Sequence, residues 1–316
     1  MFRLKLVPEK TSIDFMSYTK LATILSALLM VAAIGLFMLK GLNLGIDFKG
    51  GILIEARSEQ PADIAALRGT LGQLNLGEIA LQSFGKDTDI LVRIQRQEGD
   101  ESAQIKAIQA VTKALGDGFE IRRTEFVGPT IGAELAQKGI MAVLCALGAI
   151  MVYIWFRFEW QFSIAAIIAL THDVISTIGL FALTGFEFNL ATVAAVLTIA
   201  GYSINDTVVL FDRVRENLRK FKSWEQQDIL NKSVNETLSR TVMTSVTTAL
   251  ALIAIILFGG AVLRDFAIAM LWGVAIGTYS SVFVAIALIN RFDLKKAQDE
   301  PNDISVPEYE RGQDGA

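Results

Sequence analysis

The chain has 316 residues, a formal net charge of −4 and 52% hydrophobic residues, and its mean hydropathy is +0.45. This composition is too apolar for a soluble protein with a single core, and the negative net charge excludes a general attraction to nucleic acid. The one cysteine, Cys145, stands in an apolar run without an intrachain partner, so cysteine usage indicates no redox compartment. A polytopic α-helical membrane protein is predicted.

Apolar runs long enough to cross a bilayer, which takes about 20 residues, occur six times along the chain. They cover residues 20–39, 138–156, 162–183, 189–211, 240–259 and 266–289. Basic residues precede the first run, so a cleaved signal peptide is an alternative to a membrane anchor. Because this run is longer than the usual apolar core of a signal peptide, we predict an uncleaved first span.

Lysine and arginine are unevenly distributed among the segments between these spans. They are abundant in the N-terminal segment 1–19, the loop 212–239 and the C-terminal tail 291–316, whereas loop 184–188 has none and loop 260–265 has only Arg264. Positive charge is retained on the cytoplasmic side of a membrane. Both termini are therefore predicted in the cytoplasm, with the five spans of segment 138–290 following an outer domain at 40–137.

The outer segment 40–137 has the pattern of a small α+β domain. Strands are predicted at 52–56, 79–84, 89–94 and 119–127, with helices at 61–67 and 101–115. We expect Pro61 in the first turn of its helix and a hairpin turn over residues 85–88. The order β-α-β-β-α-β is that of the ferredoxin-like motif, and a generic α+β domain is the alternative.

An acidic group, Glu98, Asp100 and Glu101, lies just before the second of these helices. It has two interpretations, a metal site and a solvated helix start, and we favour the helix start. No metal or cofactor site is predicted elsewhere in the chain.

The fourth span carries an aspartate, Asp206, which shares a helical face with Tyr202 and Ser203. An ionised aspartate near the centre of a membrane helix costs about 2.5–3.5 kcal/mol and normally has a partner. Arg240 opens the fifth span at a similar depth. The two residues are predicted to act either as a proton-carrying pair that separates and re-forms, or as a static ion pair that locks two helices together.

The third span carries His172 and Asp173 near the bilayer centre. A histidine titrates near neutrality and can relay protons, although a buried lone histidine is often only a hydrogen-bonding residue. Asp173, His172 and Asn205 are candidates for a proton route. In the sixth span, Gly273 and Gly277 form a GxxxG pattern, which predicts close helix packing.

Four stretches have the character of specific motifs. They are GIDFKGG at 45–51, GYSINDTVV at 201–209, SRTVMTS at 239–245 and GTYSSVFVA at 277–285. Together they make the chain, from about residue 12 to 290, resemble the SecF family, the smaller membrane subunits of bacterial SecD–SecF protein-export complexes.

The resemblance implies half of a resistance-nodulation-division transporter, with six helices in the inner membrane and an inserted periplasmic domain. It implies partners as well: SecD, the Sec channel SecYEG, YajC, YidC and unfolded preproteins. The implied function is promotion of preprotein translocation by the proton motive force, with Asp206 and Arg240 as the coupling residues and no cofactor. Gly50 and Gly51 are expected to permit tight backbone geometry rather than to bind a ligand.

Other classes of function remain as alternatives. An intramembrane enzyme is disfavoured because the chain has one histidine, which excludes HExxH, and lacks GxSxG and GxxxxGK[ST]. A passive assembly subunit would show a stable Asp206–Arg240 pair that never titrates. Half of a small-molecule exporter of the same superfamily is disfavoured by the small outer domain.

Overall fold

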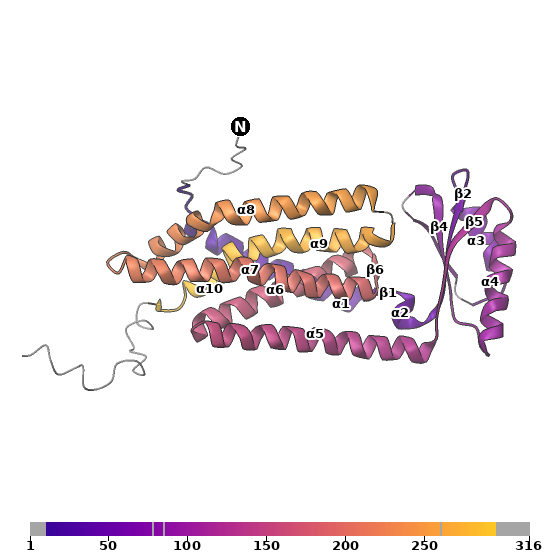
Figure 1. Ribbon diagram of the computed structural model, residues 1–316, viewed down its shortest axis with the longest axis horizontal. Coiled ribbons are helices and arrows are strands. Elements are labelled where there is room, and N and C mark those ends of the chain that lie inside the picture. Colours follow the sequence, from indigo (N-terminus) through magenta and orange to yellow (C-terminus); the bar gives the residue numbers. More distant parts are fainter. Residues whose placement is uncertain (1–10, 78, 85, 260, 295–316) are drawn as a thin grey trace, which may run out of the picture.

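The computed structural model describes residues 11–77, 79–84, 86–259 and 261–294. It has two parts, a bundle of long helices and a small domain with a four-stranded sheet at one end of the bundle (Figure 1). The predicted architecture, a polytopic helical membrane protein with an inserted α+β domain, is confirmed. Residues 1–10 of the predicted N-terminal segment and 295–316 of the predicted tail lie outside the described residues.

Within the described chain, six helices are long and apolar enough to cross a membrane, and each coincides with one of the predicted spans to within one residue or extends beyond it. The 3₁₀ turn η1 (Met16–Tyr18) leads into the first of them. The helices are α1 (Thr19–Lys40), α5 (Pro129–Arg157), α6 (Trp160–Thr184), α7 (Leu190–Lys220), α8 (Gln226–Phe258) and α9 (Ala261–Tyr279), the last continued by the π-helical segment η2 (Ser280–Ala285) and by α10 (Ile286–Ile289).

Several of these helices are longer than predicted. The segment 212–239, predicted as a loop, is mostly helical. Helix α7 continues to Lys220 and α8 begins at Gln226, so that only residues 221–225 connect the two helices. The extensions are polar on one side and buried on the other, as Val214 and Val234 illustrate. Hydropathy averaged over a window does not detect such amphipathic turns, because their polar residues cancel their apolar ones.

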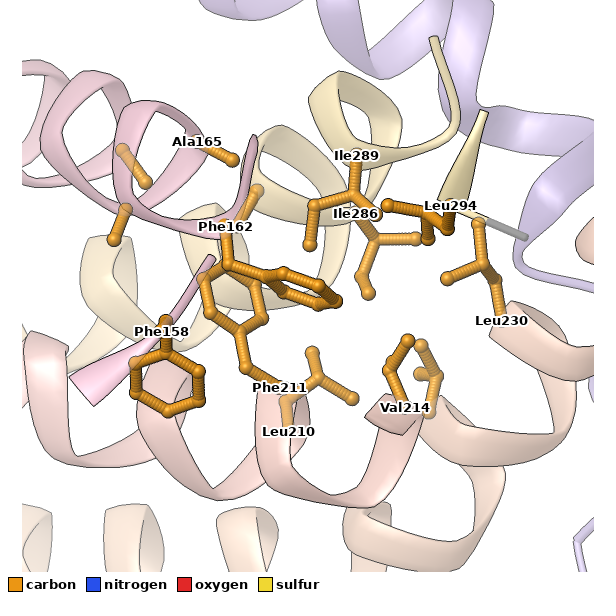
Figure 2. Close-up of a cluster of buried hydrophobic side chains, with 14 of the residues drawn as sticks. Phe158, Phe162, Ala165, Leu210, Phe211, Val214, Leu230, Ile286, Ile289 and Leu294 are labelled. Carbon is orange, nitrogen blue, oxygen red and sulfur yellow. The ribbon is translucent and has the colours of Figure 1, made fainter. Parts of the chain in front are cut away.

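A hydrophobic cluster closes the end of the bundle that lies away from the sheet (Figure 2). Phe158 and Phe162 pack edge-on against Phe211, with ring centroids 5.9 Å and 5.2 Å apart. Leu230 of α8 and Ile286 of α10 complete the cluster. The cluster joins both ends of the α7–α8 turn to the rest of the bundle, which explains why the helices persist beyond their apolar spans.

The inner helices of the bundle are α6, α7 and α9, whose apolar windows are about half buried, whereas those of α1, α5 and α8 are mostly exposed. Small residues permit the close approach of the outer helix α1. A side chain added at Gly179 of α6 would overlap Ala33 of α1. The inner helices are therefore held among protein neighbours, where polar side chains find partners.

The sheet domain contains β2 (Gly51–Ser58), α3 (Ile64–Gly72), β3 (Ile79–Phe84), β4 (Lys86–Ile94), α4 (Glu101–Leu115) and β5 (Phe119–Val127). The strands form an antiparallel sheet in the order β3-β4-β2-β5. Helices α3 and α4 cover the face turned away from the bundle (Figure 1). Alternate residues of β2, such as Ile52 and Ile54, are fully buried under these helices. The predicted ferredoxin-like order of elements is confirmed.

Two local expectations in this domain are wrong. Pro61 lies ahead of α3 instead of in its first turn, because Asp63 caps the helix by accepting hydrogen bonds from the N–H groups of Ala65 and Ala66. Strand β4 begins at Lys86, so the hairpin connection is shorter than the predicted turn 85–88, of which residue 85 lies outside the described residues.

The helix-start interpretation of the acidic group is confirmed. Asp100 is the N-cap of α4, where it accepts hydrogen bonds from Ser102 and from the N–H of Ala103. These bonds lower the pKa of Asp100, since they stabilise its charged form.

A short linking module joins the sheet to the bundle. It consists of β1 (Asn43–Leu44), the single-turn helix α2 (Ile46–Lys49), and the strand β6 (Glu187–Phe188) that pairs with β1 in parallel. Gly50 and Gly51 follow α2 with φ values of 72° and 132°, a region that other residues rarely adopt. A Cβ at Gly51 would also lie 2.8 Å from the carbonyl oxygen of Ile94. These backbone conformations are compatible with the expected structural role of the two glycines.

Candidate functional site

The carboxylate of Asp173 on α6 is fully buried in the bundle and has no exposed surface. Its Oδ2 accepts hydrogen bonds from Ser203 Oγ of α7 at 2.5 Å and from Ser280 Oγ of η2 at 2.7 Å. Its Oδ1 lies 3.0 Å from His172 Nδ1. Three segments of the chain thus converge on one buried carboxylate and satisfy its hydrogen-bonding capacity.

Two further hydroxyl groups extend this cluster. Thr207 Oγ1 and Ser281 Oγ lie 2.8 Å apart, one helical turn from the Ser203–Asp173 contact. Ser280 and Ser281 are adjacent in sequence and both are buried. They stand at the start of the π-helical segment, a type of irregularity that is frequent at functional sites.

His172 is linked to α1 through Tyr279 of α9. Its ring centroid lies 6.2 Å from that of Tyr279, whose hydroxyl donates to the carbonyl oxygen of Ala22 at 2.8 Å and lies 2.9 Å from Ser26 Oγ. His172 Nε2 is buried and has no hydrogen-bond partner among the described residues. One ring nitrogen therefore remains free for a proton or for a partner.

The predicted GxxxG pattern accounts for the close contact between α9 and α7. A Cβ at Gly277 would lie 3.0 Å from Ser203 Cβ, and one at Gly273 would overlap the side chain of Ile199. These short distances are compatible with the close helix packing expected of this pattern. Gly277 has a second effect, because the space it leaves is occupied by the serine that donates to Asp173.

Asp206 lies one turn further along α7 and has a different environment. Asp206 is only 4% exposed, and its Oδ2 has no hydrogen-bond partner among the described residues. Arg240 on α8 is exposed and interacts with Asp206 electrostatically, but no ion pair within 4.0 Å joins them in the described part of the chain. Of the two predicted arrangements, this conformation has the residues separated and not joined in an ion pair.

The predicted proton-route residues are only partly brought together. His172 and Asp173 are in contact, whereas Asn205 is exposed on the outside of α7. On α8, the hydroxyl groups of Thr244 and Thr247 donate to carbonyl oxygens of their own helix. Ser245 of α8 instead makes a hydrogen bond to α9, because its Oγ lies 2.7 Å from Thr278 Oγ1.

Sequence reasoning did not assign Ser280, Ser281 and Thr207 to the site. A usable signal was present, since Ser203 and Thr207 repeat at i and i+4 on the Asp206 helix, and two serines follow the GxxxG pattern. Chemically, the cluster is a chain of hydroxyl, carboxyl and imidazole groups, which can hold and exchange protons. The described residues contain no group of three metal-ligating side chains.

Comparisons with known proteins agree with this architecture. The family described as "Protein export membrane protein SecD/SecF, C-terminal" matches residues 107–295, and "SecD/SecF GG Motif" matches residues 35–62. The chain is 44% identical to a protein translocase subunit SecF of Rickettsia rickettsii, covering 94% of this chain and 97% of that one. It is 45% identical to the SecF subunit of Rhodobacter capsulatus, covering 96% of each chain.

Solved structures give the same result. A crystal structure of SecDF from Thermus thermophilus, described as a translocon-associated membrane protein, superimposes with a TM-score of 0.81 at 37% identity. The match covers 92% of this chain and 40% of that one. A SecDF crystal structure in a super-membrane-facing form gives a TM-score of 0.67 at 36% identity, over 94% of this chain and 41% of the other. On these grounds the chain belongs to the SecF family of protein translocase subunits.

Proposed function

We propose that this multi-pass inner-membrane subunit of the protein-export pathway uses the proton motive force, with Asp206 as the group that changes charge. Its partner would be SecD, which supplies the second half of a resistance-nodulation-division transporter. The pair would act on preproteins at the SecYEG channel, with YajC and YidC as further partners.

The observation that carries this proposal is the buried Oδ2 of Asp206, which has no hydrogen-bond partner among the described residues. A buried anion without hydrogen bonds or an ion pair is costly, whereas a protonated carboxyl is neutral. Its neighbour Asp173, one helix away, has the partners that Asp206 lacks. A group with no compensating partners changes its interaction with the surrounding helices when it gains or loses a proton, and this is the property that coupling requires.

Arg240 would be the second coupling residue. It interacts with Asp206 electrostatically and is exposed on α8, the helix adjacent to α7. A conformation in which the guanidinium approaches the carboxylate would stabilise the anion more strongly than the present one, in which the two groups form no ion pair. A stable Asp206–Arg240 ion pair would have supported the passive-subunit alternative, and this conformation does not contain one among the described residues.

The proposed topology places both termini in the cytoplasm and the sheet domain in the periplasm. Support comes from the basic residues of α7 and α8 around their connection, where Arg213, Arg215 and Lys232 cluster with glutamates. The sheet domain lies at the opposite end of the bundle (Figure 1). The small-molecule exporter alternative finds no support among the SecF and SecDF relatives.

The test is export of a secreted precursor, followed by pulse-chase in cells whose only copy of this protein carries Asp206→Asn. Asp212→Asn is the matched control, because Asp212 lies on the same helix but is exposed and ion-paired with Arg157 at 2.8 Å. We expect the Asp206 variant to assemble with SecD, to export slowly, and to lose its sensitivity to an uncoupler. Normal, uncoupler-sensitive export by an assembled Asp206→Asn complex would overturn the proposal.

A further inference from the structure

The start of helix α7, the helix that carries Asp206, is held by residues of the linking module. The N–H of Leu190, the first residue of α7, donates to Asp47 Oδ2 of α2 at 2.9 Å. In a capping box, the side chain of Asn189 accepts from the N–H of Thr192, and the side chain of Thr192 accepts from the N–H of Asn189. Thr192 Oγ1 also donates to the carbonyl oxygen of Glu187. The helix terminus is therefore fixed both by its own chain and by a carboxylate 143 residues earlier.

The backbone of the linking module strengthens this attachment. Strand β1 pairs in parallel with β6, and the N–H of Gly45 donates to the carbonyl oxygen of Phe188 at 2.9 Å. Asn43 Nδ2 donates to the carbonyl oxygen of Gly185, also at 2.9 Å. The segment between α1 and the sheet thus moves with the α6–α7 connection, which leads directly into α7.

One side chain of the sheet reaches this assembly. Arg93 of β4 forms an ion pair with Glu187 of β6, and the two side chains are only 14% and 13% exposed. Ion pairs that are screened from water act more strongly than exposed ones. Arg93 therefore connects the middle of the sheet to the residue whose carbonyl oxygen helps to cap α7.

The sheet and the linking module are otherwise loosely packed at this point. A cavity of about 510 Å³ lies between them and is lined by Lys49 and Gly50 of the module and by Ala80, Arg93 and Ile94 of the sheet. Where side chains do not fill the space, the sheet can change its angle without a large loss of packing contacts. The ion pair of Arg93 is then a main side-chain connection between the two parts at this place, beside the chain that runs from α2 through Gly50 into β2.

We propose that Arg93, Glu187 and Asp47 form a joint that transmits movement of α7 to the periplasmic sheet, with Arg93 as its positioning residue. This inference deepens the proposed function and rests on it, because the movement of α7 is the one that follows protonation of Asp206. Arg93 does not touch Asp206. It acts through Glu187 and the α7 terminus.

The joint is also sensitive to acid. Burial raises the pKa of Glu187, and the charge of Arg93 opposes this shift. The other charged groups that act on Glu187 are Asp265 at the start of α9 and Asp47 of α2, and both favour its neutral form. Glu187 therefore takes up a proton more readily than an exposed glutamate, and protonation removes its attraction to Arg93.

The test compares Arg93→Gln with the charge-swapped double variant Arg93→Glu, Glu187→Arg, each in a complex with SecD in lipid nanodiscs. Arg57→Gln is the matched control, because Arg57 makes an ion pair with Asp89 that stays within the sheet domain. Hydrogen exchange of the peptide at the start of α7 is measured first. Export with and without an uncoupler is measured in cells.

We expect Arg93→Gln to accelerate exchange at the start of α7 by about threefold or more and to reduce the uncoupler-sensitive part of export at a normal level of complex. The charge swap is expected to restore both, since an arginine at position 187 still faces Asp47 and Asp265. Unchanged exchange in Arg93→Gln, or no rescue by the swap, would overturn the joint.

The two proposals fail in different ways. Suppose that Asp206→Asn leaves uncoupler-sensitive export intact while Arg93→Gln still loosens α7. The proposed proton site is then wrong, and the joint still connects α7 to the sheet but the movement that it transmits does not follow protonation of Asp206. If Asp206→Asn abolishes that export while Arg93→Gln changes neither measurement, the proton site stands and the joint is wrong.

Discussion

Two carboxylates are buried in the helix bundle, and their surroundings are opposite in kind. Asp173 accepts hydrogen bonds from Ser203 and Ser280 and contacts His172, so each of its oxygens has a partner. Asp206, one turn from Ser203 on α7, has an oxygen with no partner among the described residues. Burial alone therefore does not identify a proton site. The partners decide whether a buried carboxylate stabilises the fold or remains available for a change of charge.

The contrast between the two carboxylates predicts the largest loss of stability for Asp173→Ala. This substitution leaves two serines and a histidine without their shared acceptor, which we expect to destabilise the bundle by about 3 kcal/mol. Thermal unfolding of the purified complex in detergent measures it. Thr171→Ala on the same helix is the control, because Thr171 is exposed and bonds only to its own helix. Equal stability of the two variants would contradict a structural role for Asp173.

A smaller effect is expected for Gly277→Ala, which tests the packing that holds Ser203 against Asp173. The added methyl group would lie 3.0 Å from Ser203 Cβ and force α9 away from α7, at a cost of about 1–3 kcal/mol. Gly148→Ala on α5 is the matched control, since nothing lies within 4 Å of its Cβ position. We expect the control to keep or raise the unfolding temperature, and a similar loss in both would argue against the packing explanation.

The effect on stability is expected to be smaller still, and opposite in sign, for Asp206→Asn. The amide removes a buried charge whose Oδ2 has no hydrogen-bond partner among the described residues, so the free energy of unfolding is expected to rise by up to about 1 kcal/mol. The unfolding temperature is measured beside the export assay. A stability loss as large as that of Asp173→Ala would mean that Asp206 is also a structural residue, and the contrast between the two carboxylates would fail.

The smallest effect concerns Glu187, a carboxylate whose partner is an arginine. Its pKa is raised by burial, so the folded protein binds its proton more tightly than the unfolded chain does. The stabilisation from this group is therefore full below the ordinary glutamate pKa of about 4.3 and declines as the pH rises through the raised value.

Glu187→Gln is expected to remove this pH dependence. The difference in unfolding temperature between the wild type and the variant is followed as the pH is raised from 4. A constant difference across that range would show that Glu187 does not titrate with a raised pKa.

Much of the fold follows from local sequence patterns. The six spans, the order of strands and helices in the sheet domain and the helix start at Asp100 were all predictable, because hydropathy and periodicity are properties of neighbouring residues. The extensions of α7 and α8 were not, because their buried faces are defined by each other and not by an apolar run. Asp63 displaced Pro61 as the helix start for a similar reason, since a cap is defined by the hydrogen bonds it makes.

The site was predictable in its residue types and not in its contacts. An aspartate and a histidine in a membrane span indicate function because water-free surroundings make them costly. By itself the sequence determined that the chain spans the membrane six times, carries an α+β domain and resembles SecF. Only the tertiary structure decided that Asp173 meets donors 30 and 107 positions away, that Oδ2 of Asp206 meets none among the described residues, and that Arg93 reaches Glu187. Such contacts depend on how helices pack, and packing is set by the whole bundle and not by any one segment.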